Sequence, residues 1–245
     1  MAAQAGKAVY VEKPMALSYK ECTEMVSTCK RLNVPLFVAY YRRALPNILK
    51  IKELINSGAI GEVRYVNISI NKPLLPDIVG AASGINNWRV LPDVSGGGYF
   101  YDLASHQLDA MDFLFGPIDL VNGFSINQSN VYPADDMTIG SFKFRSGILG
   151  QGIWSFNSCN LSDEEVTIIE GSKGRISFSF FGDHSLIMET DGNGKEKFSF
   201  KISKHIQQPL IQLIVDTLLG YGDYDETGIA AARTNKIMEM MTTNT

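Results

Sequence analysis

The 245-residue sequence has little of several features that define broad classes of protein. No apolar run approaches the ~18 residues that a membrane-spanning helix requires. The first residues, MAAQAGKAVY, contain neither the apolar stretch of a secretory signal peptide nor the arginine-rich pattern of a transit peptide. We therefore expect a cytoplasmic protein with no membrane partner.

Positive charge and cysteine are also scarce. The formal net charge of -4 argues against a nucleic-acid partner, which would require a basic face. The three cysteines, Cys22, Cys29 and Cys159, are scattered, whereas a metal site requires closely spaced ligands that usually include histidine. We interpret them as free thiols in a reducing compartment and expect no bound metal.

The sequence lacks the G-x-G-x-x-G turn of a dinucleotide-binding domain, although its first elements follow the pattern of such a domain. Apolar residues 8–12 and 35–40 predict two strands, and residues 19–32 predict a helix that begins at a capping box of Ser18 and Glu21. A strand-helix-strand unit predicts parallel strands joined by a right-handed crossover.

Two parallel strands are too few for a stable sheet. We therefore interpret residues 1–43 as the last third of a Rossmann domain and residues 44–245 as a second domain. The elements predicted next are a helix from Pro46 to Ser57-Gly58, a strand at 63–70, a long irregular stretch at 71–98 and a helix at 99–115.

The sequence pattern changes after residue 118, where short segments of alternating apolar and polar residues follow one another without a predicted helix. Seven strand candidates lie at 119–126, 137–144, 148–156, 165–171, 175–180, 185–190 and 197–202. Helices at about 206–219 and 226–242 close the chain. The predicted fold class is α/β plus α+β: the C-terminal part of a Rossmann domain, then a large, mostly antiparallel open sheet of about six or seven strands flanked by helices.

Glu12-Lys13-Pro14 follows the first predicted strand and is the first candidate for chemistry. Ligands of open α/β sheets bind at the carboxyl ends of the strands, and Pro14 keeps Lys13 out of helical geometry. An ammonium held there can polarise a carbonyl or stabilise an alkoxide. The alternative is a solvated lysine, because Lys72-Pro73 has the same pattern.

The second candidate is GGGYFYDLASHQLD, residues 96–109. Asp102 and His106 are four apart on a predicted helix and therefore share a face, where the carboxylate would orient the imidazole and raise its pKa. The glycines would let the backbone approach a ligand closely. The alternative is a surface ion pair. The other histidines, His184 and His205, have no partner in their local sequence, and we assign them no role.

Two further groups border these candidates. Trp88 and Arg89 could close over a planar ring and a phosphate, or Trp88 could simply anchor the core. Tyr41, Arg42 and Arg43 follow the second strand at the same edge as Lys13. One of these three is expected to contact ligand, while the others cap or form salt bridges.

Four stretches, in this order, resemble the glucose-fructose oxidoreductase/inositol dehydrogenase/MocA (Gfo/Idh/MocA) family: AGKAVYVEKPMALSYKE, VAYYRRALPNILKIKELINSGAIGEV, NNWR and GGGYFYDLASHQLD. The resemblance covers nearly the whole chain and thins after about residue 160. It implies an enzyme that depends on NAD or NADP, and it implies that the open sheet makes a homodimer or homotetramer.

The resemblance also implies a site. The implied residues are Glu12, Lys13, Pro14, Trp88 and Arg89 for the cofactor, and Tyr41, Arg43, Asp102 and His106 for the substrate. On this interpretation His106 takes the hydroxyl proton of a sugar or cyclitol as hydride leaves its carbon. Lys13 stabilises the oxygen, and Asp102 holds and tunes the pair.

The family's glycine-rich turn and first Rossmann strands have no counterpart in the sequence. A fragment, a misassigned start codon and a natural truncation remain open, and we expect this chain by itself to bind nucleotide poorly. Two alternatives to a sugar oxidoreductase also remain. One is a relative that cycles a bound NAD to cleave glycosidic bonds, and the other is a non-catalytic module that keeps the sheet for dimerisation.

Overall fold

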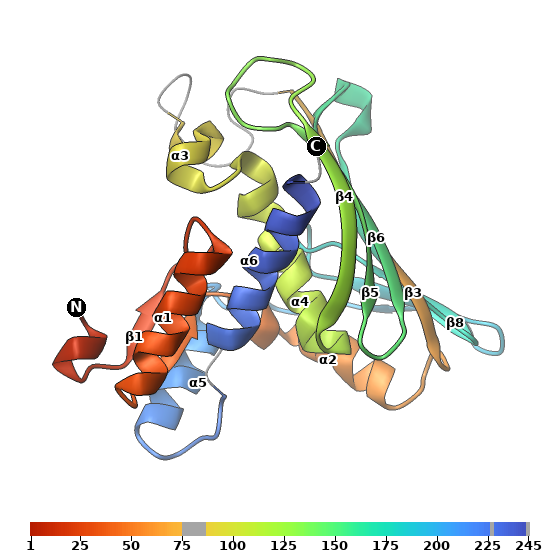
Figure 1. The fold of residues 1–245 in the computed structure, drawn as a ribbon. Coiled ribbons are helices and arrows are strands. Elements are labelled where there is room, and N and C mark those ends of the chain that lie inside the picture. Colours follow the sequence, from red (N-terminus) through yellow and green to blue (C-terminus); the bar gives the residue numbers. More distant parts are fainter. Residues whose placement is uncertain (75–86, 226–227, 244–245) are drawn as a thin grey trace.

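The computed structural model describes residues 1–74, 87–225 and 228–243 and arranges them around two sheets (Figure 1). The smaller sheet pairs β1 (Val9–Val11) with β2 (Leu36–Val38) in parallel, and α1 (Tyr19–Arg31) connects them. The strand-helix-strand prediction is confirmed, with each boundary within two residues. A single 3-10 turn, η1 (Ala3–Ala5), precedes β1.

The first helix begins where the sequence predicts. The Ser18 hydroxyl accepts a hydrogen bond from the Glu21 backbone N–H at 3.2 Å, and the Glu21 carboxylate accepts one from the Ser18 N–H at 3.1 Å. Both N-terminal donors are thereby satisfied. Cys22 and Cys29 lie on the buried face of α1 and pack against Leu36 and Val38 of β2.

The larger sheet has eight strands in the order β10-β9-β8-β7-β3-β6-β5-β4. The strands are β3 (Val63–Pro73), β4 (Ile118–Ile126), β5 (Met137–Phe144), β6 (Leu149–Ser158), β7 (Glu164–Gly171), β8 (Gly174–Phe178), β9 (Leu186–Thr190) and β10 (Gly194–Phe198). Only β3 and β6 pair in parallel, so the predicted mostly antiparallel sheet is confirmed.

The last strand was predicted at 197–202, and that position is wrong. β10 pairs with β9 through a tight turn, with Gly194 opposite Thr190 and Phe198 opposite Leu186. The apolar alternation that suggested a later strand comes from Phe198 and Phe200, which pack against the core whether or not they pair. Burial rather than strand pairing produced the pattern.

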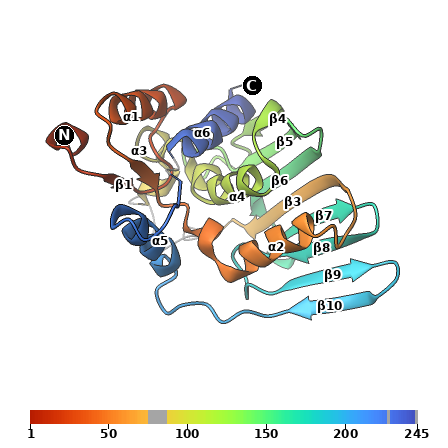
Figure 2. The ribbon, with the colours of Figure 1, turned by 90° about the horizontal axis from the view of Figure 1, so that it is seen from below.

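Helices cover one face of the large sheet. α2 (Pro46–Asn56), α4 (Ser105–Phe115) and α6 (Gly228–Thr242) lie on the same side (Figure 2). Along β5, Phe142 and Phe144 are buried, whereas Ile139 and Lys143 are exposed on the opposite side. We call that opposite side the free face, and its exposed apolar residues are Tyr65, Leu120, Phe124, Ile126, Ile139, Leu149 and Ile153.

The C-terminal helix joins the two sheets. Ala231 and Ala232 of α6 belong to the core of the small sheet, whereas Ile237, Met238 and Met241 belong to the core of the large one. The helix therefore holds residues 1–43 against the rest of the chain. The domain boundary after residue 43 stays a prediction.

The segment between β3 and β4 holds several short helical pieces. The predicted irregular stretch at 71–98 is partly regular: β3 runs to Pro73, and η4 (Trp88–Val90) and α3 (Pro92–Ser95) follow, while 75–86 lies outside the described residues. The predicted helix at 99–115 begins as a π-helical turn, η5 (Phe100–Ala104), and continues as α4.

The remaining described elements are η2 (Tyr41–Ala44), η6 (Asn160–Ser162) and α5 (Gln208–Leu218). The α5 and α6 helices confirm the two predicted C-terminal helices. Among the helices that the structure describes, none has the length and apolar character that crossing a membrane demands.

Candidate active site

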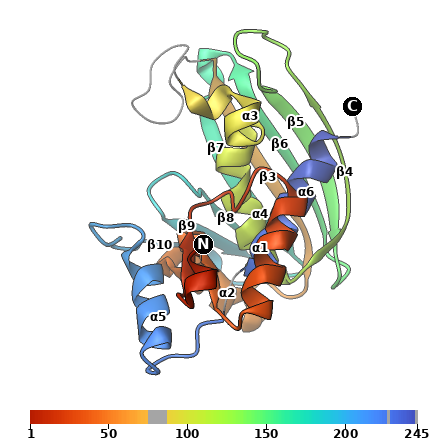
Figure 3. The ribbon, with the colours of Figure 1, turned by 60° about the vertical axis from the view of Figure 1, so that its left-hand side comes forward.

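The residues singled out in the sequence come from both sheets. Lys13 follows β1, and Tyr41 begins η2 directly after β2, so both lie at the carboxyl ends of parallel strands. Asp102 lies in η5, and His106 lies in the first turn of α4. Figures 1 and 3 show α6 between α1 and the large sheet, with α4 beside α6.

Lys13 and Asp102 form the central contact. The Lys13 ammonium donates to the Asp102 carbonyl oxygen at 2.9 Å and forms an ion pair with its carboxylate. The Arg89 Nε lies 3.3 Å from the other carboxylate oxygen of Asp102. The Lys13 and Asp102 side chains are each 14% exposed, so water screens this contact only weakly. One carboxylate thus holds two cations in place.

His106 is buried among aromatic rings. Its ring centroid lies 5.9 Å from that of Tyr40, 5.1 Å from Tyr41 and 6.4 Å from Phe181. Burial holds the pKa of His106 well below its usual range, and the positive charges of Lys13 and Arg42 lower the pKa further. The imidazole is therefore neutral near pH 7 and able to accept a proton.

The expected effect of Asp102 on His106 is wrong. A carboxylate four residues away was predicted to orient the imidazole and raise its pKa, but the pKa is lowered. The reason is the burial of the imidazole, to which the positive charges of Lys13 and Arg42 add. The Asp102 carboxylate is committed to Lys13 and Arg89 instead.

Arg43 was predicted to line the pocket, which stays a prediction, and the structure shows it in a buried ion pair. Its Nε and Nη2 groups each donate to an oxygen of the Asp109 carboxylate at 2.6 Å, and the pair is buried. Burial raises the pKa of Asp109 to about 6, while the carboxylate raises the pKa of Arg43. Arg43 is a structural cation that fixes η2 to α4.

Arg42, its neighbour, is the arginine beside His106. Its guanidinium carbon lies 4.4 Å from the Phe181 ring centroid and 5.2 Å from that of Tyr41. It donates to the Phe180 carbonyl oxygen, whereas Nε has no hydrogen-bond partner in the described part of the chain. Burial lowers the pKa of Arg42.

The residues expected at the cofactor lie nearer the surface. The Trp88 side chain is exposed, so the core-anchor alternative is excluded, and the Arg89 guanidinium carbon lies 4.7 Å from its ring centroid. Glu12 is exposed and accepts from the Lys13 backbone N–H at 3.3 Å. Pro14 is half-buried, and the Lys13-Pro14 peptide bond is cis.

The glycines at 96–98 make room for the protein itself rather than for a ligand. A Cβ on Gly97 would lie 2.3 Å from the Tyr101 ring, and one on Gly98 would lie 2.6 Å from Ala134. Gly98 also has a φ of +73°, in the left-handed region. The expectation of a close backbone approach to a ligand is therefore replaced by internal packing.

Sequence reasoning missed Phe181 and underrated His184. Both lie just beyond β8, in a stretch that alternation alone assigned to the strand and its turn. The pKa of His184 is lowered by burial and then by Arg42, which brings this histidine into the same neighbourhood. The pair Phe180-Phe181 at a strand end was the only available signal. Within the described ranges no three His, Cys, Asp or Glu side chains gather as metal ligands.

Two family models match the chain. The "Oxidoreductase family, NAD-binding Rossmann fold" matches residues 1–40, and the "GFO/IDH/MocA C-terminal domain" matches residues 48–177. Their order along the chain is the order expected from the quoted motifs.

Several curated proteins are similar to this chain in sequence. "Oxidoreductase P35" of Formosa agariphila is 37% identical over 235 residues, which cover 96% of this chain and 71% of the relative. Myo-inositol 2-dehydrogenase of Thermotoga maritima is 28% identical over 71% of this chain and 50% of its own length. The 2,7-anhydro-N-acetylneuraminate hydratase of Escherichia coli is 30% identical over 71% of this chain and 46% of its own length.

Solved structures share the fold. Levoglucosan dehydrogenase in complex with NADH and levoglucosan superposes with a TM-score of 0.84 and 19% identity over 98% of this chain and 72% of that one. An aldose-aldose oxidoreductase from Caulobacter crescentus has a TM-score of 0.78 and 22% identity over 98% of this chain and 70% of its own. At these identities the likeness concerns the fold.

Proposed function

Because the chain belongs to the Gfo/Idh/MocA family of NAD-binding oxidoreductases, we propose that it transfers hydride between a nicotinamide and a secondary alcohol or ketone of a sugar, a cyclitol or a related small molecule. One observation carries the proposal: a buried, neutral His106 lies within the electrostatic reach of a Lys13 ammonium that Asp102 fixes in place.

Each of the three residues has a distinct task. His106 accepts the hydroxyl proton of the substrate during oxidation and returns it during reduction. Lys13 donates a hydrogen bond to the substrate oxygen, whose negative charge grows as the proton leaves. Asp102 holds the ammonium at two points, its carbonyl and its carboxylate, so that Lys13 is positioned before the substrate arrives.

The residues at the carboxyl end of β1 fit the nicotinamide end of NAD or NADP. Glu12, Lys13 and Pro14 form the strand end, and the exposed Trp88 indole, with Arg89 beside it, offers a flat apolar surface next to a positive charge. When bound, the cofactor takes up or supplies the hydride. Tyr41, whose ring borders His106, is proposed to contact the substrate.

A second candidate is a reaction without net oxidation. Two relatives carry the name 2,7-anhydro-N-acetylneuraminate hydratase, and they are 29% and 30% identical to this chain. A site with one proton-accepting imidazole and one ammonium also suits a cycle in which hydride leaves the substrate and later returns. Substrate conversion without accumulation of reduced nicotinamide would favour this candidate.

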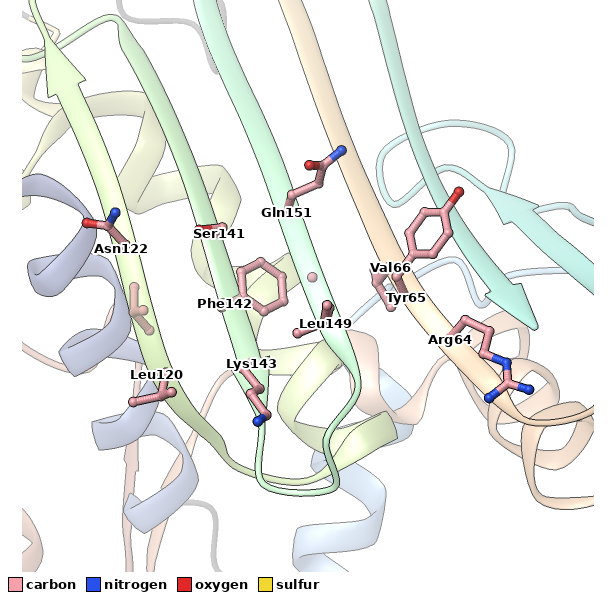
Figure 4. Close-up of a pocket in the computed structure, with 12 residues that line it drawn as sticks. Arg64, Tyr65, Val66, Leu120, Asn122, Ser141, Phe142, Lys143, Leu149 and Gln151 are labelled. Atoms are coloured by element: carbon pink, nitrogen blue, oxygen red, sulfur yellow. The ribbon is translucent and has the colours of Figure 1, made fainter. Parts of the chain in front are cut away.

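We further propose that two copies associate through the free face, as a homodimer or as half of a homotetramer. Across three strands Phe124 lies opposite Ile139, and Ile139 lies opposite Ile153. A groove of about 720 Å³ hollows the same face, and Figure 4 shows Leu120, Lys143 and Leu149 beside it on neighbouring strands. An exposed apolar surface of this extent is typical of an interface.

The direct test supplies the protein with a large excess of NAD or NADP, because this chain by itself is expected to bind nucleotide poorly, and with a panel of neutral and acidic sugars and cyclitols. The absorbance of reduced nicotinamide reports the reaction. Hydride transfer with at least one of these compounds is expected. His106→Ala should lower turnover by roughly 10²–10⁴-fold, while Lys195→Ala, at an exposed position on β10, should retain it. Equal turnover in the His106→Ala variant would reject the proposed role.

A further inference from the structure

Four side-chain nitrogens near the proposed site are inaccessible to solvent and have no hydrogen-bond partner in the described part of the chain: Arg42 Nε, Arg89 Nε, His106 Nδ1 and His184 Nδ1. Arg89 Nε lies 3.3 Å from the Asp102 carboxylate in an ion pair, which leaves the other three. Leaving a buried polar group without a partner is unfavourable, so an unpartnered buried donor marks a place where a ligand can accept the hydrogen bond. Arg42 and His106 are themselves more than nine-tenths buried.

Arg42 and His106 border a common pair of rings. Tyr41 and Phe181 both contact the Arg42 guanidinium, with centroid distances of 5.2 Å and 4.4 Å. The same two rings lie 5.1 Å and 6.4 Å from the His106 ring. Arg42 and His106 therefore flank one small aromatic surface, and His184 follows Phe181 by three residues.

Arg42 differs from the other cations of the site. Lys13 and Arg89 both pair with Asp102, whereas no carboxylate of the described residues lies within ion-pair distance of Arg42. The Glu165 carboxylate accepts hydrogen bonds from the Gln107 side chain and from the Phe181 backbone N–H, both at 3.1 Å. The other arginines nearby are paired, Arg43 with Asp109 and Arg233 with Asp112.

We propose that Arg42, assisted by His184, forms a subsite for a carboxylate carried by the sugar substrate. A carboxylate would pair with this buried guanidinium and would accept the hydrogen bond that Arg42 Nε does not make within the described part of the chain. This inference rests on the proposed function and names its substrate class: acidic sugars such as uronic acids, rather than neutral aldoses.

The test is a binding measurement that does not depend on turnover. Isothermal titration compares D-glucuronate, D-glucose and D-glucose 6-phosphate against the wild-type protein at low salt. D-glucuronate should bind at least tenfold more tightly than D-glucose, because a hydrogen bond to a charged group contributes about that factor or more. Arg42→Gln should abolish the difference, and Arg42→Lys should retain part of it.

Controls separate loss of the subsite from loss of the fold. Arg64→Gln removes an exposed arginine at the edge of the free face and should leave the preference intact. His184→Gln keeps Arg42 and should weaken D-glucuronate binding without changing D-glucose binding. If Arg42→Gln lowers the melting temperature, two measurements still test the subsite. They are the preference of the wild-type protein for D-glucuronate over D-glucose and the loss of D-glucuronate binding in His184→Gln.

The outcomes distinguish the two proposals. Equal binding of D-glucuronate and D-glucose overturns the subsite, while hydride transfer from neutral sugars would leave the proposed function standing. Tight D-glucuronate binding without any hydride transfer supports the subsite and counts against the function. Preference for D-glucose 6-phosphate over D-glucuronate also overturns the carboxylate assignment and identifies a phosphate site.

Discussion

Lys13 and Asp102 are 89 residues apart in sequence, yet the Lys13 ammonium bonds to both the carbonyl and the carboxylate of Asp102. One partner follows a strand of the small sheet, and the other lies in the π-helical turn before α4. The contact therefore closes the site across the two sheets. Because the pair is mostly buried, it fixes the amine more firmly than a surface ion pair would.

Replacing Lys13 by methionine should lower turnover by roughly 10²–10⁴-fold, because the substrate oxygen loses its positive hydrogen-bond donor. Lys72→Met is the matched control, since Lys72 also precedes a proline and forms an ion pair, with Asp163 at 2.5 Å, outside the site. Steady-state kinetics on both variants check the prediction. Equal losses in the two variants would count against a special role for Lys13.

The pH dependence of kcat/KM should report the lowered pKa of His106. A base whose pKa is depressed remains unprotonated as the pH falls, so activity should persist below pH ~6.5, the ordinary histidine value. Removing the positive charge of Lys13 makes protonation easier and raises that pKa. The acidic limb of the residual activity in Lys13→Met should therefore move to higher pH, and a limb that stays in place or moves down contradicts the assignment.

Local sequence signals predicted much of the fold because they act over a few residues. The capping box at Ser18 and Glu21 fixed the start of α1, and alternation along 137–144 identified β5 with the correct ends. The last strand was misplaced because Phe198 and Phe200 alternate for packing, while its pairing is decided by the turn before Gly194. Pairing partners are a tertiary property that one segment does not encode.

In the candidate site, too, the local features were predicted from the sequence and the tertiary contacts were not. Strand ends indicated where Lys13 and Tyr41 would lie, since the position of a strand's carboxyl end follows from the strand itself. The sequence did not reveal the π-helical turn that separates Asp102 from His106. Nor did it show which of two adjacent arginines pairs with Asp109, because that choice depends on a helix 66 residues away.

Asp109→Asn should destabilise the protein by roughly 3–5 kcal/mol, because it leaves the buried guanidinium of Arg43 without a countercharge. Asp119→Asn is the control: Asp119 pairs with Arg145 on the surface, and its loss should hardly change stability. Urea denaturation followed by circular dichroism measures both. A similar denaturation midpoint for the two variants would show that the buried pair has no structural role.

Cys159 should react first with iodoacetamide in the native protein. It is exposed, and hydrogen bonds from Ser162 and the backbone lower its pKa, whereas burial raises the pKa of Cys22 to about 12. Mass spectrometry after brief labelling should find one modified cysteine per chain. Cys159→Ser should then label only after denaturation, and rapid native labelling of that variant would contradict the buried positions of Cys22 and Cys29.

The proposed interface on the free face predicts a monomeric variant. Ile139 lies at the centre of the row formed with Phe124 and Ile153, and it is already exposed in the isolated chain. Ile139→Lys should therefore fold normally but place a charge in the middle of any apolar contact, which costs several-fold or more in association. Val131→Lys adds the same charge at an exposed loop position away from the row and should leave the assembly unchanged.

Light scattering after size exclusion should give a dimer or tetramer for wild type and Val131→Lys and a monomer for Ile139→Lys. A wild-type monomer at micromolar concentration would end the proposal, because an apolar face of this kind would then remain open to water.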